Sequence, residues 1–410
     1  MVGEKRLWGG EYPNDTSPGP SLTEEGRQKM KILNISLDKK LFEAGSRVEE
    51  RVLEYAEIFD RFDILVLCGL GYEKKEFDPR YAEGYGRASK IAIWPTNSRN
   101  KLFYLFDAIR LGGEMIEKYG HDLISVQEPF ETGLIGWRLA RKCGLKFQVQ
   151  LHGDFFGSLY FRKESLLNRF RYYLGRFIVR RADGVRVVSE RIKRSLLEMG
   201  IEEEKISVVP IHADLRFKNY DLRIQKDEKK FVFLAVGRLV LVKNIEMQIK
   251  AMTEVVKKYP EAELWIIGDG KKERSLKSEV KKLELEERVK FFGWRNDLDA
   301  FYQKADVFLL TSNYEGWGLA AIEAASFGLP IIMTDVGCAG EVVIDGESGI
   351  VILVGDSKKL AESMLKLIED AHLRKKLGEE ARQAVLRLPD KEQSLKNYKG
   401  AFKKILNIDQ

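Results

Sequence analysis

Short apolar runs alternate with longer amphipathic stretches from residue 30 onward. The runs have the length of buried strands, and the stretches between them repeat apolar residues at helical spacing. In the first half, the pattern predicts strands over Lys31–Ser36, Ile64–Leu67, Ile91–Trp94, Leu123–Gln127, Phe147–Leu151, Gly184–Val188 and Ile206–Val209. In the second half, it predicts strands over Phe231–Val236, Glu263–Ile267, Val289–Phe292, Val307–Leu310, Ile331–Thr334 and Gly349–Val351. Strands that alternate with helices form parallel sheets, so we expect an α/β protein with two doubly wound, Rossmann-like domains.

The domain boundaries are predicted from where this alternation stops. Residues 1–29 contain scattered prolines and glycines without periodicity, which predicts a flexible leader. We expect a first domain over residues 30–212 and a second over residues 213–390. The end of the chain, residues 391–410, begins with a helix that has one apolar face, Lys391–Leu406, and we expect this helix to pack back on the first domain.

Composition narrows the classes of function. The 410 residues carry 69 basic and 63 acidic side chains, a net charge of +6 that is mixed along the chain and disfavours a dedicated nucleic-acid binder. The 3 cysteines lie far apart and have no metal-ligand spacing, which is typical of a reducing compartment. No apolar run approaches the roughly 18–20 residues that cross a bilayer. We therefore expect a cytoplasmic protein.

Two cations lie in the loop that follows the apolar strand Phe231–Val236. Arg238 and Lys243 stand between that strand and the next predicted helix, at the edge where parallel sheets bind ligands. A diphosphate carries roughly two negative charges, and two cations with a helix N-terminus balance them. The balance closes without a metal, so we expect no metal and no separate cofactor. The alternative is an ordinary solvated basic loop.

A second segment opens a helix after the strand Val307–Leu310. Gly318 and Leu319 supply the unpaired backbone N–H groups of a helix start, which favour an anion. Glu315 precedes this helix and Glu323 lies inside it, so both carboxylates can border one pocket. The alternative is a pair of ordinary loop and helix carboxylates.

The second half resembles the donor domain of GT-B glycosyltransferases, specifically the retaining glycosyltransferase family 4, or group 1 transferases. The stretches that carry the resemblance occur in family order over residues 230–355 and are specific as a set. They are Gly237-Arg-Leu with Lys243-Asn244, Ile266-Ile-Gly-Asp-Gly270, Phe291-Phe-Gly293, Ala305-Asp306, the Glu315 and Glu323 pair, and Thr334-Asp-Val-Gly through Gly349.

The first half resembles the same family more loosely. The matching parts are Gln127-Glu-Pro-Phe, the strand that ends in His152-Gly-Asp, and Arg181-Ala-Asp183. Gly45 follows the first strand, where the family often has two adjacent glycines, but here Ala44 precedes it. The resemblance implies that the backbone at Gly45 meets the phosphates of the donor.

The resemblance also implies a role for each site residue. Arg238 and Lys243 would hold the diphosphate and stabilise it as the leaving group. Gly318 and Leu319 would add backbone N–H groups to it, and the backbone near Arg295 would border the base.

Three further residues would bind the sugars. Glu315 would bind hydroxyl groups of the transferred sugar, and Glu323 would bind the ribose. His152 would face the donor sugar and orient a hydroxyl group. For His152 alone, a packed or capping histidine at a strand end is the alternative.

The activity implied is that of a metal-independent, retaining hexosyltransferase. It would move a sugar from a nucleotide-diphosphate sugar to a hydroxyl of an acceptor glycan or lipid-linked glycan, in cell-surface polysaccharide or glycolipid synthesis. The alternatives are a sugar-nucleotide epimerase on the same scaffold and a non-catalytic sugar-nucleotide-binding subunit. Asp297-Leu-Asp299 matches the Asp-x-Asp of metal-dependent transferases, but it begins a predicted helix, so we interpret it as helix capping.

The stretch 166–181 contains five arginines among aromatic and aliphatic residues and no acidic residue. A helix of this composition can rest on an anionic membrane, which would place the protein at the inner face of the plasma membrane. The alternative is a half-buried helix whose arginines extend outward to water. A peripheral membrane-binding protein without transferase activity is a further alternative.

Overall fold

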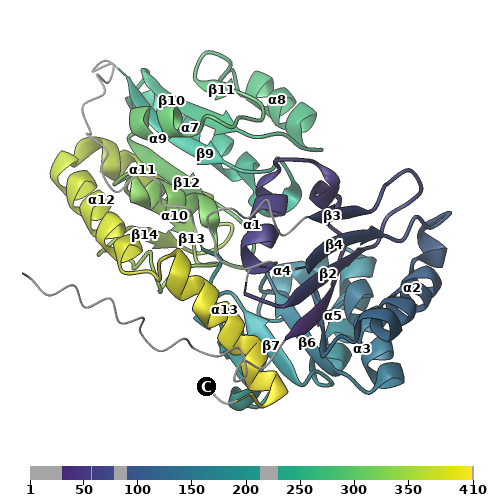
Figure 1. Ribbon diagram of the computed structural model, residues 1–410. Coiled ribbons are helices and arrows are strands. Elements are labelled where there is room, and N and C mark those ends of the chain that lie inside the picture. The colour runs from purple at the N-terminus through teal and green to yellow at the C-terminus, as the bar shows by residue number, and fades with distance from the viewer. Residues whose placement is uncertain (1–29, 57, 78–89, 213–229, 409–410) are drawn as a thin grey trace, which may run out of the picture.

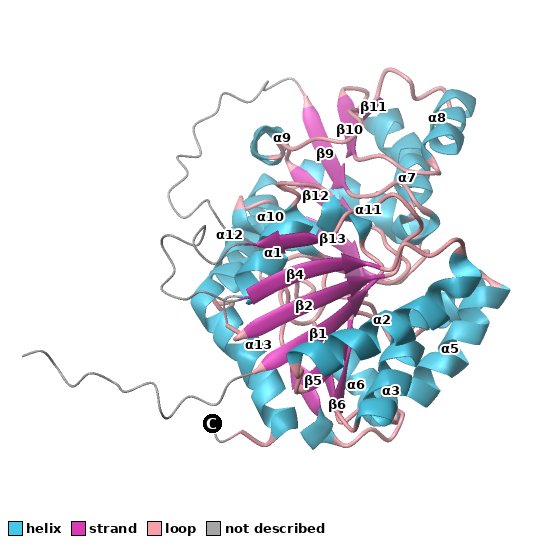
Figure 2. Ribbon diagram, turned by 45° about the vertical axis from the view of Figure 1, so that its right-hand side comes forward, coloured by secondary structure: helices cyan, strands magenta, loops and turns pink. Residues whose placement is uncertain are grey.

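The computed structural model describes residues 30–56, 58–77, 90–212 and 230–408, and it arranges them as two α/β domains (Figure 1). The predicted leader and most of the predicted joint between the domains lie outside the described residues. Each domain has one sheet with helices on its faces (Figure 2). The predicted architecture of two parallel-sheet domains is therefore confirmed.

The first domain contains an eight-stranded sheet in the order β3-β4-β2-β1-β5-β6-β7-β8. All neighbouring strands are parallel except β3, which is antiparallel to β4. The strands are β1 (Lys31–Ser36), β2 (Arg61–Val66), β3 (Lys75–Phe77), β4 (Lys90–Pro95), β5 (Leu123–Val126), β6 (Lys146–Leu151), β7 (Gly184–Val187) and β8 (Ile206–Val208). Its helices are α1 (Arg47–Ala56), α2 (Tyr104–Tyr119), α3 (Glu131–Cys143), α4 (Leu159–Glu164), α5 (Leu166–Val179) and α6 (Glu190–Glu198).

The second domain contains a six-stranded parallel sheet in the order β11-β10-β9-β12-β13-β14. Its strands are β9 (Phe231–Val236), β10 (Ala262–Ile267), β11 (Val289–Phe291), β12 (Val307–Leu310), β13 (Ile331–Thr334) and β14 (Ile350–Ile352). Its helices are α7 (Ile245–Lys258), α8 (Glu273–Lys282), α9 (Asp299–Lys304), α10 (Leu319–Ser326), α11 (Ser357–Glu369) and α12 (Ala371–Leu386). The strand order changes direction between β9 and β12, and such sheets bind ligands at this switch point.

Helix α12 was not predicted from the sequence, and its composition explains why. Its buried face consists of Leu377, Gly378, Ala381 and Val385, so small residues replace large apolar ones at half of the positions. A Cβ atom at Gly378 would lie 2.1 Å from the carbonyl oxygen of Gly328, so the helix approaches the second domain too closely for a larger side chain. Because this close approach requires small residues on the buried face, the sequence lacks the repeat of large apolar residues by which a helix is predicted.

Helix α13 (Lys391–Leu406) leaves the second domain and lies against β6, β7 and α1 of the first (Figure 1). Tyr398 and Phe402 are fully buried in its face. The ring of Phe402 contacts that of Phe59 edge to face, with 4.9 Å between the ring centroids. The helix therefore belongs to the core of the first domain. In the described parts of the chain, no helix combines the length and hydropathy that a membrane span needs.

We expect Phe402→Ala to lower the free energy of unfolding of the first domain by about 3–5 kcal/mol, because it removes a fully buried ring and leaves a cavity. Lys396→Ala, an exposed position on the same helix, serves as the control and should change it by less than about 0.5 kcal/mol. Urea unfolding followed by circular dichroism measures both values. Equal stability of the two variants would show that α13 is not part of this core.

Candidate active site

The loops at the carboxyl ends of β9, β10 and β12 lie side by side because these strands are neighbours in the second sheet. Two of the loops approach each other very closely, since a Cβ at Gly268 would lie 2.0 Å from the carbonyl oxygen of Gly237. Gly268 also has a φ of +133°, which residues with a side chain rarely adopt. Glycine at this position lets the three loops form one surface.

The structure brings together two of the predicted site residues, Lys243 and Glu315. The Lys243 ammonium forms an ion pair with Glu315 Oε1, and both side chains are largely buried. Ser312 Oγ donates a second hydrogen bond to the same carboxylate oxygen, at 2.7 Å. One predicted cation, from the loop after β9, and one predicted carboxylate, from the loop after β12, are therefore in direct contact.

Asn244 and Asn313 tie these two loops to each other. Asn244 has the left-handed conformation, with φ 47°, and ends the short turn that contains Lys243. The Nδ2 of Asn244 donates to Asn313 Oδ1 at 3.3 Å, and the backbone N–H of Asn313 donates to the carbonyl of Val242 at 2.7 Å. The lysine is thus held by a loop fixed at both ends. The sequence motifs included Asn244 but gave no indication of Asn313.

Arg238 lies on the same loop as Lys243 and is exposed. Among the described residues it forms no ion pair, in contrast to Lys243. Its charge reaches Tyr314, the neighbour of Glu315: burial and Glu164 raise the pKa of Tyr314 to about 12, and Arg238 opposes that rise. Arg238 therefore borders the same part of the domain surface as the ion pair.

Helix α10 begins at this surface with Gly318, whose φ is +89°. No side chain caps this helix start, and the N–H of Leu319 has no hydrogen-bond partner among the described residues, so it is available for an anion. The N–H of Ala321, by contrast, donates to the carbonyl of Gly318 at 2.8 Å. Glu323 lies on the same helix, where it accepts a hydrogen bond from the hydroxyl of Tyr302 at 3.0 Å. Arg295 is exposed in the loop after β11, and no described contact links it to the ion pair.

The two domains meet at His152 and Gly316. A Cβ at Gly316 would lie 2.0 Å from the carbonyl oxygen of His152, so glycine is required for this contact. The backbone N–H of Asp154 donates to the carbonyl of Glu315 at 3.4 Å. The end of β6 in the first domain therefore touches the loop that carries the ion pair in the second.

The ring of His152 is hydrogen-bonded to one amide side chain, which is in turn held by a second amide side chain. His152 Nε2 donates to Gln127 Oε1 at 2.8 Å, and Gln127 Nε2 donates to Asn34 Oδ1 at 3.1 Å. Burial, together with the positive charges of Arg186 and Arg51, lowers the pKa of His152 to about 3. The ring is therefore neutral near pH 7, and since Nε2 carries the proton, Nδ1 is a hydrogen-bond acceptor.

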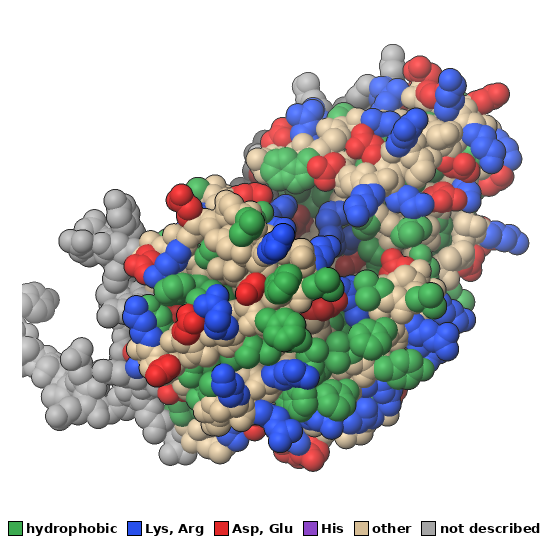
Figure 3. All heavy atoms as spheres, turned by 90° about the vertical axis from the view of Figure 1, so that its right-hand side faces the viewer, with side chains coloured by type: hydrophobic (Ala, Val, Ile, Leu, Met, Phe, Trp, Pro, Cys, Tyr) green, Lys and Arg blue, Asp and Glu red, His purple; other side chains and the backbone are tan. Residues whose placement is uncertain are grey.

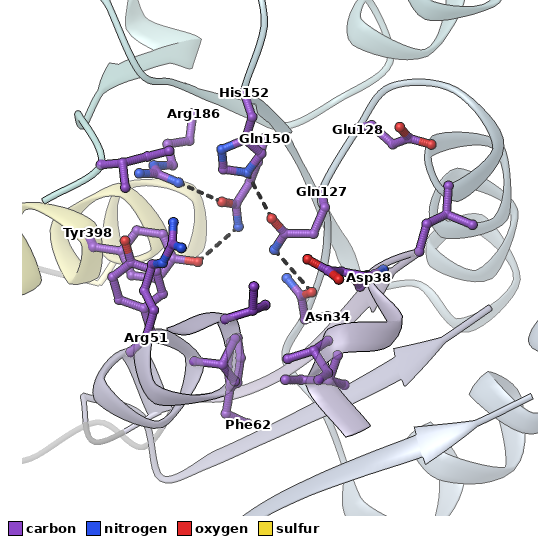
Figure 4. Close-up of a pocket in the computed structure, with 18 residues that line it drawn as sticks. Asn34, Asp38, Arg51, Phe62, Gln127, Glu128, Gln150, His152, Arg186 and Tyr398 are labelled. Carbon is purple, nitrogen blue, oxygen red and sulfur yellow. Dashed lines mark hydrogen bonds between the residues drawn. The ribbon is translucent and has the colours of Figure 1, made fainter. Parts of the chain in front are cut away.

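His152 also lines a cavity of about 370 Å³ over the first sheet (Figure 4). The cavity lies between α1, α13 and the carboxyl ends of β1, β5 and β6. Four of its labelled polar residues lie within strands or directly after one, at positions that would otherwise be apolar: Asn34, Gln127, Gln150 and Arg186. Asn34, Gln150 and Arg186 were not predicted from the sequence. The polar residues Gln148, Gln150 and His152, which alternate along β6 and just after it, could have indicated Gln150, because alternate residues share one face of a sheet.

Gly45 lies just before α1 and has a φ of +71°, so a residue with a side chain would be strained there. Its N–H donates to the buried Glu49 Oε2 at 2.7 Å. This hydrogen bond is within the first domain, and the structure does not place Gly45 against Arg238 or Lys243.

The interpretation of Asp297-Leu-Asp299 as a helix cap is wrong, because neither aspartate caps the helix that begins there. Helix α9 begins at Asp299, its N-cap position is the buried Leu298, and no side chain makes a capping hydrogen bond. Asp299 lies in the first turn, where a carboxylate interacts favourably with the helix dipole. Throughout the described ranges, no group of three or more His, Cys, Asp or Glu side chains is arranged to hold a metal ion.

Two family models match the chain, one for each domain. The model described as "Glycosyl transferase 4-like domain" matches residues 48–212, and the model described as "Glycosyl transferases group 1" matches residues 217–384. The two matches follow the two sheets of the structure.

Individual proteins of known name agree with the family models. The chain is 27% identical over 361 residues to UDP-Gal:alpha-D-GlcNAc-diphosphoundecaprenol alpha-1,3-galactosyltransferase of Escherichia coli. This match covers 83% of this chain and 89% of that protein. It is 28% identical over 305 residues to N-acetyl-alpha-D-glucosaminyl L-malate synthase of Bacillus anthracis, which covers 72% of this chain and 78% of that protein.

The fold matches that of sucrose-phosphate synthase from Thermosynechococcus elongatus with a TM-score of 0.77 and 20% sequence identity. The match covers 92% of this chain and 100% of the other. Two facing parallel-sheet domains, both family models and these relatives together show that the chain belongs to the group 1 glycosyltransferases and has the GT-B fold.

Proposed function

We propose that this glycosyltransferase moves a sugar from a nucleotide-diphosphate sugar to an acceptor hydroxyl, with retention of configuration and without a metal ion. The observation that carries the proposal is the position of Lys243, which is paired with Glu315 in the loop that lies against the backbone of His152 at the domain contact. We place the reaction centre between this cation, the carboxylate and the neutral histidine.

The charge on the leaving group is balanced by residues of the second domain. When a diphosphate enters, Lys243 can exchange its ion pair with Glu315 for contact with the phosphates, and Arg238 adds a second cation from the same loop. The first-turn N–H groups at Gly318 and Leu319 supply part of a further positive charge. Removal of water as the domains close strengthens each of these interactions.

The transfer step breaks the bond between C1 of the sugar and the phosphate oxygen, and the bonding electrons pass to that oxygen. The acceptor hydroxyl oxygen forms the new bond to C1 from the same face of the sugar. Its proton passes to the departing phosphate oxygen, so no separate base is needed. Released from Lys243, Glu315 accepts hydrogen bonds from sugar hydroxyls, and His152 Nδ1 accepts another.

The names of the relatives support the donor class. The donor in the name of the Escherichia coli relative is UDP-Gal, a nucleotide-diphosphate sugar. Glu323, one turn into α10, is the carboxylate that we assign to the ribose, and we assign the surface near Arg295 to the base. We further propose that the reaction serves cell-surface polysaccharide or glycolipid synthesis.

Product analysis separates this proposal from its alternatives. A sugar-nucleotide epimerase would change the free sugar nucleotide in the absence of any acceptor. A non-catalytic subunit would bind the donor and yield no product with any acceptor. A transferase releases the nucleoside diphosphate in proportion to the glycoside that it forms.

We also propose that the first domain rests on an anionic membrane. Helix α5 exposes large apolar side chains in its first half, with Leu166 at 85% and Phe170 at 64% exposure, whereas it buries Gly175 and Ile178 in its second half. Apolar as well as basic side chains of this helix therefore reach the surface. Exposed apolar residues also lie just before α2 and in its first turn, on the same side of the molecule (Figure 2): Leu102, Phe103 and Phe106.

Basic side chains surround these apolar residues on the same face (Figure 3). The exposed ones in and beside α5 are Lys163, Arg169, Arg180 and Arg181. A surface with apolar residues among cations matches a bilayer that contains acidic lipids. Such contact would bring the active site to a lipid-linked acceptor.

The proposed contact of Lys243 with the diphosphate gives the first of three predictions about function. We expect Lys243→Ala to lower kcat by at least ~10²-fold, comparable to the loss of one preorganised charge-stabilising donor. Lys250→Ala, an exposed lysine on α7 paired with Glu246, is the matched control and should leave kcat unchanged. Steady-state release of nucleoside diphosphate measures both, and a Lys243→Ala enzyme with near-normal turnover would refute the assigned role.

The protonation state of His152 gives the second prediction. Because its pKa is lowered to about 3, the ring stays neutral and Nδ1 stays an acceptor as the pH falls from 8 to 5. The ratio of kcat/KM between the wild type and His152→Asn should therefore remain constant over this range. A histidine with an ordinary pKa of about 6.5 would be protonated on acidification, and the advantage of the wild type would shrink. His372→Asn, at an exposed histidine, is the control.

The membrane surface gives the third prediction. The protein should sediment with vesicles that contain phosphatidylglycerol and not with pure phosphatidylcholine vesicles, and salt should release it. Leu166→Ser with Phe170→Ser should lower the partition coefficient at least ~10-fold, because each buried apolar side chain contributes about 1.5–3 kcal/mol.

Leu353→Ser is the control for that experiment, because Leu353 is 71% exposed but lies on the second domain. Equal binding by all three proteins would contradict a membrane-facing role for α5.

A further inference from the structure

The cavity over the first sheet contains two arginines on one side. Arg51 reaches it from α1, and Arg186 reaches it from β7 (Figure 4). Both lie near the ring of Tyr398, and the centre of the Arg186 guanidinium is 5.0 Å from the centroid of that ring. The wall of the cavity that is formed by α1, β7 and α13 is therefore cationic and aromatic.

Arg186 is unusual because it is buried inside a strand. Its side chain is 1% exposed, and its three hydrogen bonds go to neutral acceptors. Nε and Nη2 donate to the carbonyl of Val209 at 3.1 and 2.7 Å, and Nη1 donates to Gln150 Oε1 at 2.9 Å. Since each terminal nitrogen carries two N–H groups, one on each is left for a further acceptor.

No carboxylate in the described part of the chain forms an ion pair with Arg51 or Arg186. A buried charge without a counter-charge is costly in a folded protein, and such charges are usually paired. The positive charge of both arginines also reaches His152, since both contribute to the lowering of its pKa. The two cations thus lie within electrostatic reach of the reaction centre.

The carboxylates that do line the cavity lie at its other end. Asp38 and Glu128 are separated from the arginines by the amide side chains of Gln127 and Gln150 (Figure 4). Burial and the neighbouring Glu131 raise the pKa of Glu128 to about 7, and its Oε1 atom is buried without a hydrogen-bond partner. These two acids therefore do not neutralise the cationic wall.

The middle of the cavity can bind hydroxyl groups. Asn34 is 2% exposed, and its Nδ2 donor has no partner in the structure. Its Oδ1 is already used by Gln127, so the free donor is fixed in orientation. A ligand that spans the cavity would meet cations at one end, an amide donor in the middle and His152 beside the domain contact.

We propose that this cavity is the acceptor site and that it takes a hydroxylated acceptor carrying a phosphate or carboxylate group, with Arg51 and Arg186 as the anion-binding pair. This inference rests on the proposed transferase function, because it assigns the class of the acceptor. The anionic group would anchor the molecule at the cationic wall and present one of its hydroxyls near His152. A cavity of about 370 Å³ accommodates a small polyol with one such group.

A binding experiment tests the anion site without relying on turnover. Inorganic phosphate is titrated by calorimetry into the wild type and into Arg51→Gln, Arg194→Gln and Lys243→Ala. We expect Arg51→Gln to weaken phosphate binding at least 10-fold. Arg194→Gln, at an exposed arginine of α6 outside the cavity, should match the wild type. Equal binding by Arg51→Gln and the wild type, or loss only in Lys243→Ala, would overturn the proposal.

Arg186→Gln provides a second variant, because Gln keeps a donor toward the carbonyl of Val209. Its thermal unfolding is measured first, and a folded variant should also lose phosphate binding. If this variant does not fold, Arg51→Gln, which changes a residue on the helix that covers the sheet, decides the question.

Matched acceptors then separate the anion site from the transferase proposal. The same alcohol is tested with and without a phosphate group, and Arg51→Gln should raise KM at least 10-fold for the phosphorylated form only, with the donor KM unchanged. Equal KM changes for both alcohols would overturn the proposal. Phosphate binding that depends on Arg51 in a protein without transfer activity would refute the proposed function and leave the anion site in place.

Competition against bound inorganic phosphate identifies the source of the anion. Glycerol 3-phosphate represents a soluble acceptor, and vesicles that contain phosphatidylglycerol, which has both a phosphate and free hydroxyl groups, represent a lipid one. Displacement by either supports the site and assigns its source. Displacement by neither would overturn the proposal.

Discussion

The contact between the His152 backbone and Gly316 sets the geometry of the whole site. The two sheets belong to different domains, and parallel sheets of this kind bind ligands at their carboxyl edges. Only a residue without a side chain allows the loop after β12 to lie against the end of β6, since a Cβ would be 2.0 Å from the His152 carbonyl oxygen. Because of this contact, the loop that carries Glu315 lies against the end of the strand that leads to His152, although the two residues come from different domains. A larger residue at Gly316 would separate the two halves of the site.

Within this geometry, the pair of Lys243 and Glu315 has a function that neither residue has alone. Each charge is partly buried, and an unpaired charge there would be unfavourable. The pair keeps both residues neutralised and in position. In the proposed function, a diphosphate would compete for the lysine, and the same exchange would release Glu315 for sugar hydroxyls. Under that proposal, binding of the leaving group and recognition of the sugar are linked through one ion pair.

The sequence predicted this side of the site because its residues follow strands. Lys243 and Glu315 are 72 positions apart, yet β9 and β12 are neighbours in a doubly wound sheet, so their loops had to meet. The other side was missed, because Asn34, Gln150 and Arg186 lie within strands, where hydrophobic patterning assumes a core. Their polarity becomes meaningful only once the register places Gln150 opposite Arg186 on a single face.

That polar face also explains why the end of the chain crosses back to the first domain. A sheet with buried amides and an arginine cannot be covered by a purely apolar helix without leaving donors and acceptors unpaired. Helix α13 supplies the Tyr398 hydroxyl, which accepts a hydrogen bond from Gln150 Nε2 at 2.9 Å, and its ring packs near Arg186. Since Tyr398 and Phe402 are buried against the first domain, α13 is part of that domain although it follows the second domain in the chain. The residues that line the cavity therefore come from the first domain and α13 alone.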